Sequence, residues 1–165
     1  MKIGVISDTH VTSAGGGLPA EVPLRLQAEG VALILHAGDL VHPRVLDLLG
    51  EIAEVRAVAG NMDPPVLRAS LPSKRVETVD GVRIGIIHGS GPPTRLGERL
   101  LAAFDGEEID ALVFGHAHEP RNEICRGVLL FNPGSAAGTR GGGCGTFGIL
   151  TVESGEITGE IVRLD

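Results

Sequence analysis

The chain of 165 residues has little aromatic side-chain area, with no tryptophan or tyrosine and four phenylalanines. Proteins that bind extended single-stranded nucleic acid stack bases on aromatic rings, and few residues could do so here. Lysine and arginine number 14 against 21 aspartates and glutamates, the net charge is −7, and no basic run stands out. We therefore expect no extended nucleic-acid partner.

Cysteine and long apolar runs are also scarce. The two cysteines, Cys125 and Cys144, lack C-x-x-C spacing, so we expect no disulfide framework and interpret Cys144 as a small core residue. No charged segment followed by a long apolar one precedes the first strand-like run, and no stretch approaches the roughly 20 residues of a membrane span. These features favour a cytoplasmic protein with no membrane partner.

Length and composition favour one domain over residues 1–165, since hydrophobic residues make up 42% of the chain, enough for a core. Apolar runs predict strands at residues 2–7, 31–35, 54–59, 111–114, 123–125, 128–131, 146–152 and 157–164. Residues 75–79 and 82–86 alternate polar and apolar side chains around Asp80-Gly81, a strong hairpin signal.

Helical spacing completes the expected elements. Helices are predicted at residues 23–29, from Pro43 onward and at residues 94–104, where Thr94 would be the N-cap. Together with the strands, they indicate an α/β fold in which helices cover the outer faces of two packed mixed sheets.

Five short motifs rich in metal-binding side chains follow one another along the chain, mostly at the ends of apolar runs. They are Asp8-Thr9-His10, Gly38-Asp39, Gly60-Asn61-Met62-Asp63, His88-Gly89 and Gly115-His116-Ala117-His118. Because a parallel sheet brings its strand ends to one edge, we expect these side chains to meet in one pocket. Carboxylates, imidazoles and one amide suit two divalent metal ions rather than one.

Each motif alone also has an ordinary interpretation. Asp8 and His10 would point to the same side of an extended segment, yet such a pair is more often a turn residue beside a surface histidine. Asn61 after a glycine suits a simple turn. His88 alone could be an ordinary histidine at a strand end. It is the occurrence of all five motifs in one chain that favours a metal site.

Two further polar residues, His36 and Asp63, lie near or within the motifs in the sequence. His36 lies three positions before Asp39, and it is either a packed strand histidine or a residue that orients a ligand. Asp63 is expected to form a hydrogen bond within its own turn rather than to touch metal.

In their order, D-x-H, G-D, G-N-x-D, H-G and G-H-x-H, the motifs resemble those of the calcineurin-like metallophosphoesterases. The short chain and the segment Asn132-Pro133-Gly134-Ser135 resemble the small bacterial and archaeal phosphodiesterase branch of that family. The resemblance implies a four-layer α/β/β/α sandwich. It also implies two metal sites that share Asp39 as a bridge. The first would consist of Asp8, His10, Asp39 and His118. The second would consist of Asp39, Asn61, His88 and His116.

The resemblance further implies that a metal-bridging hydroxide attacks the phosphorus of a small phosphodiester, with phosphomonoesters as further candidates. Asp39, Asn61 and His88 would be the catalytic residues. Many relatives have a histidine where this chain has Met62, which cannot donate a proton to a leaving group. We therefore expect activated aryl phosphodiesters to react faster than alkyl phosphomonoesters. Arg140 is either a substrate-binding residue that contacts phosphate or a solvated loop arginine.

The metal, the oligomeric state and the function each keep more than one candidate. Manganese is the expected metal, with iron, zinc, nickel and cobalt as alternatives. A homodimer or higher homo-oligomer would match small relatives. The alternative function is a non-catalytic protein-binding scaffold of the same fold, like the metallophosphoesterase-fold subunit of retromer, although that subunit departs from the full ligand set. A nuclease acting on a dinucleotide or cyclic nucleotide is a third candidate.

Overall fold

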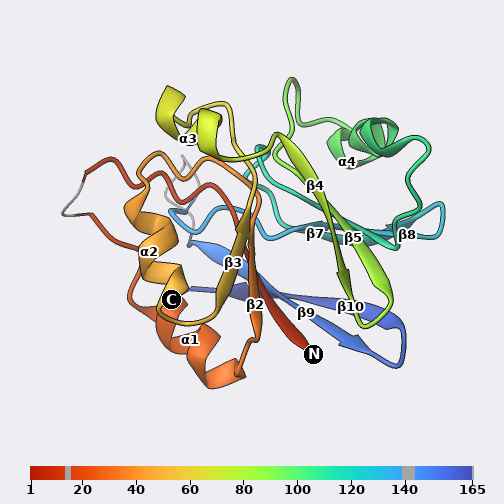
Figure 1. Cartoon of the computed structure of the whole chain (residues 1–165), viewed down its shortest axis with the longest axis horizontal. Coiled ribbons are helices and arrows are strands. Elements are labelled where there is room, and N and C mark those ends of the chain that lie inside the picture. Colours follow the sequence, from red (N-terminus) through yellow and green to blue (C-terminus); the bar gives the residue numbers. More distant parts are fainter. Residues whose placement is uncertain (14–15, 139–143, 165) are drawn as a thin grey trace.

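The computed structural model describes residues 1–13, 16–138 and 144–164. In that part of the chain two five-stranded sheets pack face to face, with helices on their outer faces (Figure 1). Arg140, the residue predicted to contact substrate, lies outside the described residues. None of the helices described is long and apolar enough to cross a membrane.

The first sheet has the strand order β10-β9-β1-β2-β3. Its strands are β1 (Lys2–Ile6), β2 (Leu33–His36), β3 (Glu54–Ala57), β9 (Thr146–Glu153) and β10 (Glu156–Arg163). The three strands β1, β2 and β3 pair in parallel, and β9 joins β1 in the antiparallel direction. The sheet is therefore mixed, with its parallel ends directed to one edge.

The second sheet has the order β4-β5-β6-β8-β7. Its strands are β4 (Lys74–Val79), β5 (Val82–Ile87), β6 (Ala111–Phe114), β7 (Arg121–Cys125) and β8 (Val128–Asn132). Here β5, β6 and β8 run parallel, while β4 and β7 add antiparallel edges. The β4–β5 turn at Asp80-Gly81 has φ values of 47° and 83°, so the predicted hairpin turn is confirmed.

Alternation along the strands separates an inter-sheet core from two outer ones. Ile3 and Val5 of β1 join the core between the sheets, where they share one cluster with Ile84 and Phe131 of the second sheet. Ile6, of opposite parity, packs toward the helices. Most of these side chains are fully buried, so apolar contact between the sheets stabilises the sandwich.

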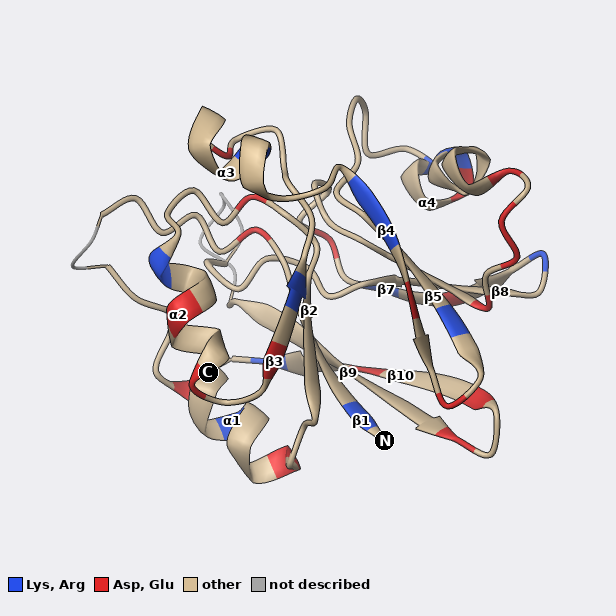
Figure 2. Ribbon diagram, viewed as in Figure 1, with Lys and Arg blue, Asp and Glu red and all other residues tan. Residues whose placement is uncertain are grey.

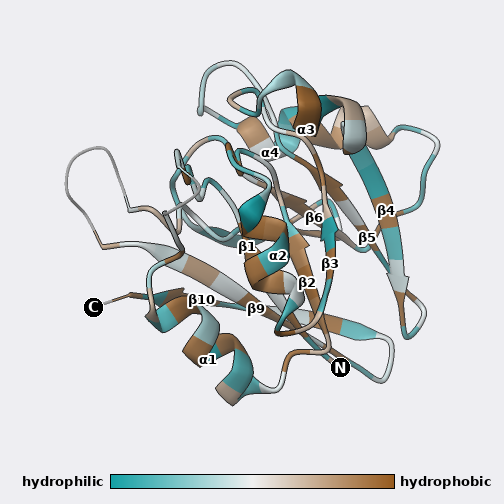
Figure 3. Ribbon diagram, turned by 60° about the vertical axis from the view of Figure 1, so that its left-hand side comes forward, coloured by the Kyte–Doolittle hydropathy of each residue, from teal (hydrophilic) through white to brown (hydrophobic). Residues whose placement is uncertain are grey.

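Three helices, α1 (Glu21–Glu29), α2 (Arg44–Gly50) and α3 (Pro65–Ser70), pack on the first sheet through Val22, Leu26, Val45, Leu49 and Leu67. The second sheet is covered by α4 (Leu96–Leu101) and the 3₁₀ turn η1 (Ala102–Phe104). Helix α1 alternates hydrophobic and hydrophilic segments along its ribbon (Figure 3), as an amphipathic surface helix should. The predicted four-layer α/β/β/α arrangement is confirmed.

One helix was missed, and two local expectations were wrong. Helix α3 was not predicted, because its six residues are too short for a clear period. Thr94 does not cap α4; the helix begins after Arg95, which has a φ of 48°, and no side chain forms a cap hydrogen bond. Cys144 is exposed rather than part of the core.

Candidate metal centre

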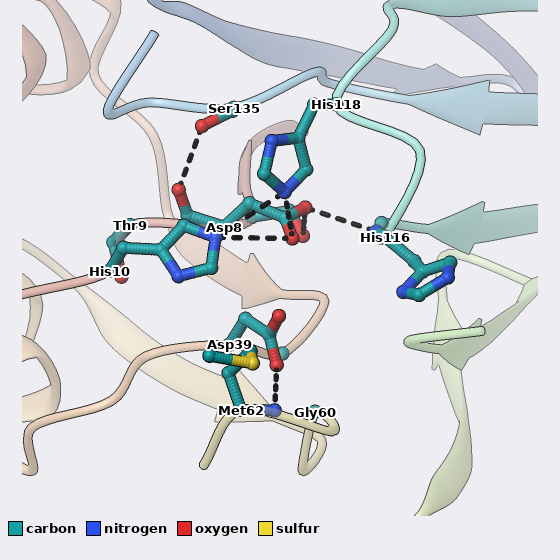
Figure 4. Close-up of polar contacts among 12 residues, drawn as sticks. Asp8, Thr9, His10, Asp39, Gly60, Met62, His116, His118 and Ser135 are labelled. Carbon is teal, nitrogen blue, oxygen red and sulfur yellow. Dashed lines mark hydrogen bonds and ion pairs between the residues drawn. The ribbon is translucent and has the colours of Figure 1, made fainter. Parts of the chain in front are cut away.

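The five motifs lie in the loops that follow parallel strands of both sheets. Asp8 and Asp39 come after β1 and β2, and His88 comes directly after β5. His116 and His118 follow β6. Figure 4 shows the side chains of Asp8, His10, His118 and Asp39 close to one another, as expected for strand ends that share an edge.

The first cluster consists of Asp8, His10 and His118. The Nε2 atoms of His10 and His118 lie 3.3 Å apart, and they lie 3.8 and 3.1 Å from Asp8 Oδ1. The other Asp8 oxygen, Oδ2, accepts hydrogen bonds from the Ser7 hydroxyl at 2.7 Å and from the His116 backbone N–H at 3.1 Å. Asp8 Oδ1 is buried and accepts no hydrogen bond within the described residues, so it is free to bind an ion.

The second cluster gathers around Asn61. His88 Nδ1 lies 2.7 Å from Ala37 O, and because a carbonyl can only accept, Nδ1 carries the hydrogen. The Nε2 lone pair of neutral His88 then faces Asn61 Oδ1 at 3.0 Å and Asp39 Oδ2 at 3.3 Å. An imidazole nitrogen, an amide oxygen and a carboxylate oxygen thus converge, and either a proton on Nε2 or a cation can lie between them.

His116 repeats this arrangement from the other side. Its Nε2 donates to Gly91 O at 3.0 Å, which leaves the Nδ1 lone pair directed at Asn61 Oδ1, 3.1 Å away. Metal-binding histidines in proteins commonly donate their other ring N–H to a backbone carbonyl in this way. Both His88 and His116 therefore direct one ring nitrogen at Asn61 Oδ1.

The donor set fits divalent cations. Lone pairs that face each other at about 3 Å repel unless a cation or proton lies between them. The described residues include two groups of three possible ligands, and within each group the ligand atoms lie within 4.8 Å of one another. One group is Asp8, His10 and His118, and the other is Asp8, Asp39 and His88. Imidazole and carboxylate together suit first-row transition metals.

Electrostatics within the cluster favour charged carboxylates. Burial raises the pKa of the Asp8 carboxyl, but His118, the charge of His88 and the Ser7 hydroxyl outweigh it, so the pKa lies below its usual 3.8. Burial also acts against ionisation of Asp39, yet contact with His88 keeps that pKa low as well. Both carboxylates are therefore anionic at neutral pH.

His88 shows the complementary effect. Burial lowers its pKa, but contact with Asp39 and the charge of Asp8 raise it above 6.5 overall. A proton on His88 therefore occupies the region where a cation would relieve the same negative field.

The backbone at the proposed ligands is strained rather than extended. Positive φ values occur at Asp8 (52°), His10 (46°), Asp39 (57°), His116 (69°) and His118 (57°). The expectation that Asp8 and His10 lie in an extended segment was therefore wrong. Residues other than glycine rarely adopt this region, and such strain concentrates at functional sites.

A match to a family model decides the relationship. The model for the calcineurin-like phosphoesterase superfamily domain matches residues 1–155. The chain belongs to this superfamily. A probable metallophosphoesterase from Methanocaldococcus jannaschii is 42% identical over 137 residues, which cover 82% of this chain and 68% of that protein.

Solved structures show the same calcineurin-like fold. An archaeal phosphodiesterase superposes with a TM-score of 0.77 at 25% identity, covering 98% of this chain and 100% of that one. The zinc complex of Vps29 from Entamoeba histolytica superposes with a TM-score of 0.78 at 25% identity, covering 99% of each chain.

Contacts between loops hold this candidate metal centre in shape. Asp63 Oδ2 accepts the Gly60 N–H at 2.7 Å, which confirms the expected turn, and Oδ1 accepts the Val41 N–H at 2.7 Å. The Met62 N–H donates to Asp39 Oδ1, also at 2.7 Å. A Cβ on Gly60 would lie 2.2 Å from Asp39 Oδ1, so only glycine permits this approach.

His36 is a packed strand histidine, one of the two roles that its position suggested. It is fully buried, and burial lowers its pKa from 6.5 to about 3, so it is neutral. The Gly38 N–H donates to its Nδ1 at 3.1 Å, so the ring hydrogen lies on Nε2, which donates to Thr9 Oγ1 at 3.2 Å. Because Thr9 separates Asp8 from His10, the imidazole connects two ligand-bearing loops.

Two polar contributors had no predicted role. The Ser135 hydroxyl donates to Asp8 O at 2.9 Å (Figure 4). Asn132 Nδ2 donates to Gly115 O at 3.1 Å, next to His116. Their signal was the segment Asn132-Pro133-Gly134-Ser135 at the end of the buried strand β8, which by itself does not reveal which loop it contacts.

Proposed function

We propose that the chain is a metal-dependent phosphodiesterase. Water and a small phosphodiester would react to give a phosphomonoester and an alcohol. The observation that carries the proposal is the convergence of imidazole nitrogens and carboxylate oxygens into groups that a cation can bind. The family and an archaeal phosphodiesterase of the same fold support it.

Two divalent ions, of which manganese is the expected one, would be held by the two sets of residues implied by the family resemblance. The first set is Asp8, His10, Asp39 and His118, and the second is Asp39, Asn61, His88 and His116. When bound, such ions supply positive charge for phosphate oxygens and lower the pKa of water. Figure 2 shows basic and acidic segments interspersed over the helices and strands, so the chain gathers no strong positive field of its own.

The chain's own groups position this chemistry. The Met62 N–H holds the Asp39 carboxylate, and contacts with backbone carbonyls fix the orientation of the His88 and His116 rings. The side chain of Met62 is about half exposed beside Asp39, but it has no proton to give to a departing alkoxide. Substrates whose alcohol leaves easily are therefore favoured.

The test is a paired assay with added manganese. We expect hydrolysis of bis-p-nitrophenyl phosphate, loss of that activity with chelator, and a kcat/KM at least tenfold higher than for an alkyl phosphomonoester such as glycerol phosphate. Equal rates on the two substrates would contradict the role of Met62.

The second candidate is a protein-binding scaffold. It is favoured by the structural likeness to Vps29, the metallophosphoesterase-fold subunit of retromer named above, because the likeness spans nearly the full length of both chains. Metal-loaded protein that binds two ions yet leaves every phosphate ester intact would support this candidate over the enzyme.

A further inference from the structure

A cavity of about 220 Å³ opens beside the candidate metal centre. It is lined by Ala59, Asn61, Ser73, Ile87, His88, Gly89, Ser90 and Leu100. Two of these residues, Asn61 and His88, are proposed ligands, so the cavity begins where the second metal site ends.

The remaining lining comes from elements around the end of β5. Ile87 and Ser90 belong to β5 and the loop after it, Ser73 precedes β4, and Leu100 lies on α4. Helices α3 and α4 lie at the same end of the molecule as these loops (Figure 1). A ligand in the cavity would therefore extend from the metal centre toward α4.

The cavity lining is suited to an uncharged ligand group. Ala59, Ile87 and Leu100 offer apolar surface, and Ser73 and Ser90 offer hydroxyls. No lysine, arginine, aspartate or glutamate is among the lining residues, so a second charged group would have no partner there. The volume is below the roughly 300–1,000 Å³ of pockets for drug-sized ligands. An uncharged organic group of a few carbon atoms fits best.

We propose that this cavity binds one ester group of the phosphodiester substrate, and that this group is small, uncharged and largely apolar. The inference rests on the proposed function, because the phosphate must be held at the metal centre for its ester group to reach the cavity. It narrows the substrate class to diesters with at least one compact neutral alcohol.

Phosphonates test the proposal by binding alone, since this hydrolysis does not cleave their C–P bond. The manganese-loaded protein is titrated calorimetrically with methylphosphonate, propylphosphonate and 2-aminoethylphosphonate. Two further buried methylenes should make propylphosphonate bind about tenfold more tightly than methylphosphonate. The aminoethyl compound matches propyl in size but carries a positive charge, so it should lose that gain. Equal dissociation constants for the methyl and propyl compounds would overturn the proposal.

Substitutions at the cavity test whether the tighter binding of propylphosphonate arises there. Ser73 is exposed at the cavity, so Ser73→Phe fills it from a loop, and Ser90→Phe does so from the facing loop. Each should reduce the tenfold ratio to about one. Thr78→Phe, at an exposed position on β4 outside the cavity, is the control and should keep the ratio.

The outcomes separate the two proposals. If the metal-loaded protein neither binds methylphosphonate nor hydrolyses bis-p-nitrophenyl phosphate, the phosphoesterase proposal fails. If it hydrolyses the diester but binds none of the phosphonates, only the assignment of the cavity fails. If methylphosphonate binds but the propyl advantage is missing, or persists in both cavity variants, only the assignment of the cavity fails.

Discussion

At the scale of single residues, the two oxygens of Asp8 have opposite tasks. Oδ2 is held by the Ser7 hydroxyl and the His116 N–H, whereas Oδ1 faces two imidazoles without a hydrogen bond among the described residues. Fixing one oxygen orients the other, so the carboxylate is prepared for a ligand before any ligand arrives. Neutral His36 likewise holds the Thr9 hydroxyl by a hydrogen bond from its Nε2.

His36 should make the apoprotein sensitive to acid. The pKa of His36 is about 3 in the folded protein and 6.5 in the unfolded chain. Between these pH values the unfolded chain binds a proton at His36 and the native state does not. This contribution to stability is complete above pH 6.5 and decreases as the pH falls toward 3. Between pH 7 and 5 the loss should be about 2 kcal/mol.

Urea unfolding in chelator at the two pH values measures this loss. His36→Gln cannot titrate, so the free energy of unfolding of the variant should fall by about 2 kcal/mol less than that of the parent. His42→Gln, at a half-exposed loop histidine, is the matched control. The same pH dependence in the parent and in His36→Gln would rule out the buried neutral ring.

At the scale of elements, the site is built from loops that are tied to one another rather than from single strands. Asp63 joins the loop after β3 to the loop after β2 through Gly60 and Val41. The Met62 N–H then reaches Asp39 across the same gap. The strained backbone at Asp39 is thus maintained by neighbours that leave it little freedom.

Replacing the carboxylate of Asp63 should loosen both loops. Asp63 is 3% exposed, so Asp63→Ala leaves two backbone N–H groups without their acceptors, at a cost of about 2–5 kcal/mol in the free energy of unfolding. Bound metal should also decrease, because Asp39 shifts. Denaturation and metal analysis test this, with Asp47→Ala on the exposed side of α2 as the control. Unchanged metal content in folded Asp63→Ala would contradict the link between the loops.

At the scale of the whole molecule, the proposed ligands come from both sheets. Asp8, Asp39 and Asn61 follow strands of the first sheet, and His88 and His116 follow strands of the second. A cation shared by these groups would connect the two layers at one edge, in addition to the apolar core between them. Metal binding should therefore stabilise the fold as a unit.

Metal titration tests this coupling. Manganese at a hundredfold excess over its dissociation constant should raise the free energy of unfolding by about 2.7 kcal/mol per site. Asp39→Ala, which removes the proposed bridge, should bind neither ion and lose the whole effect. His10→Ala should weaken only the first site. Two ions retained in purified Asp39→Ala would refute the bridging role.

Much of the fold could be read from neighbouring residues. Apolar runs and the Asp80-Gly81 turn predicted most strands and the hairpin, because these depend on local periodicity and turn chemistry. The four layers were implied by the family resemblance of the motifs. Helix α3 and the start of α4 were missed since short helices carry too little periodic signal, and packing decided them.

The sequence by itself determined which chemical groups the chain offers and that they follow strands. Only the tertiary structure decided how they are presented: which nitrogen of His88 and His116 holds the hydrogen, which oxygen of Asp8 is left free, and that His36 is neutral. His10 and His118 are separated by 108 positions yet lie with their Nε2 atoms 3.3 Å apart. Such contacts, and the burial that shifts each pKa, arise only when distant loops are brought to one edge of the folded sheets.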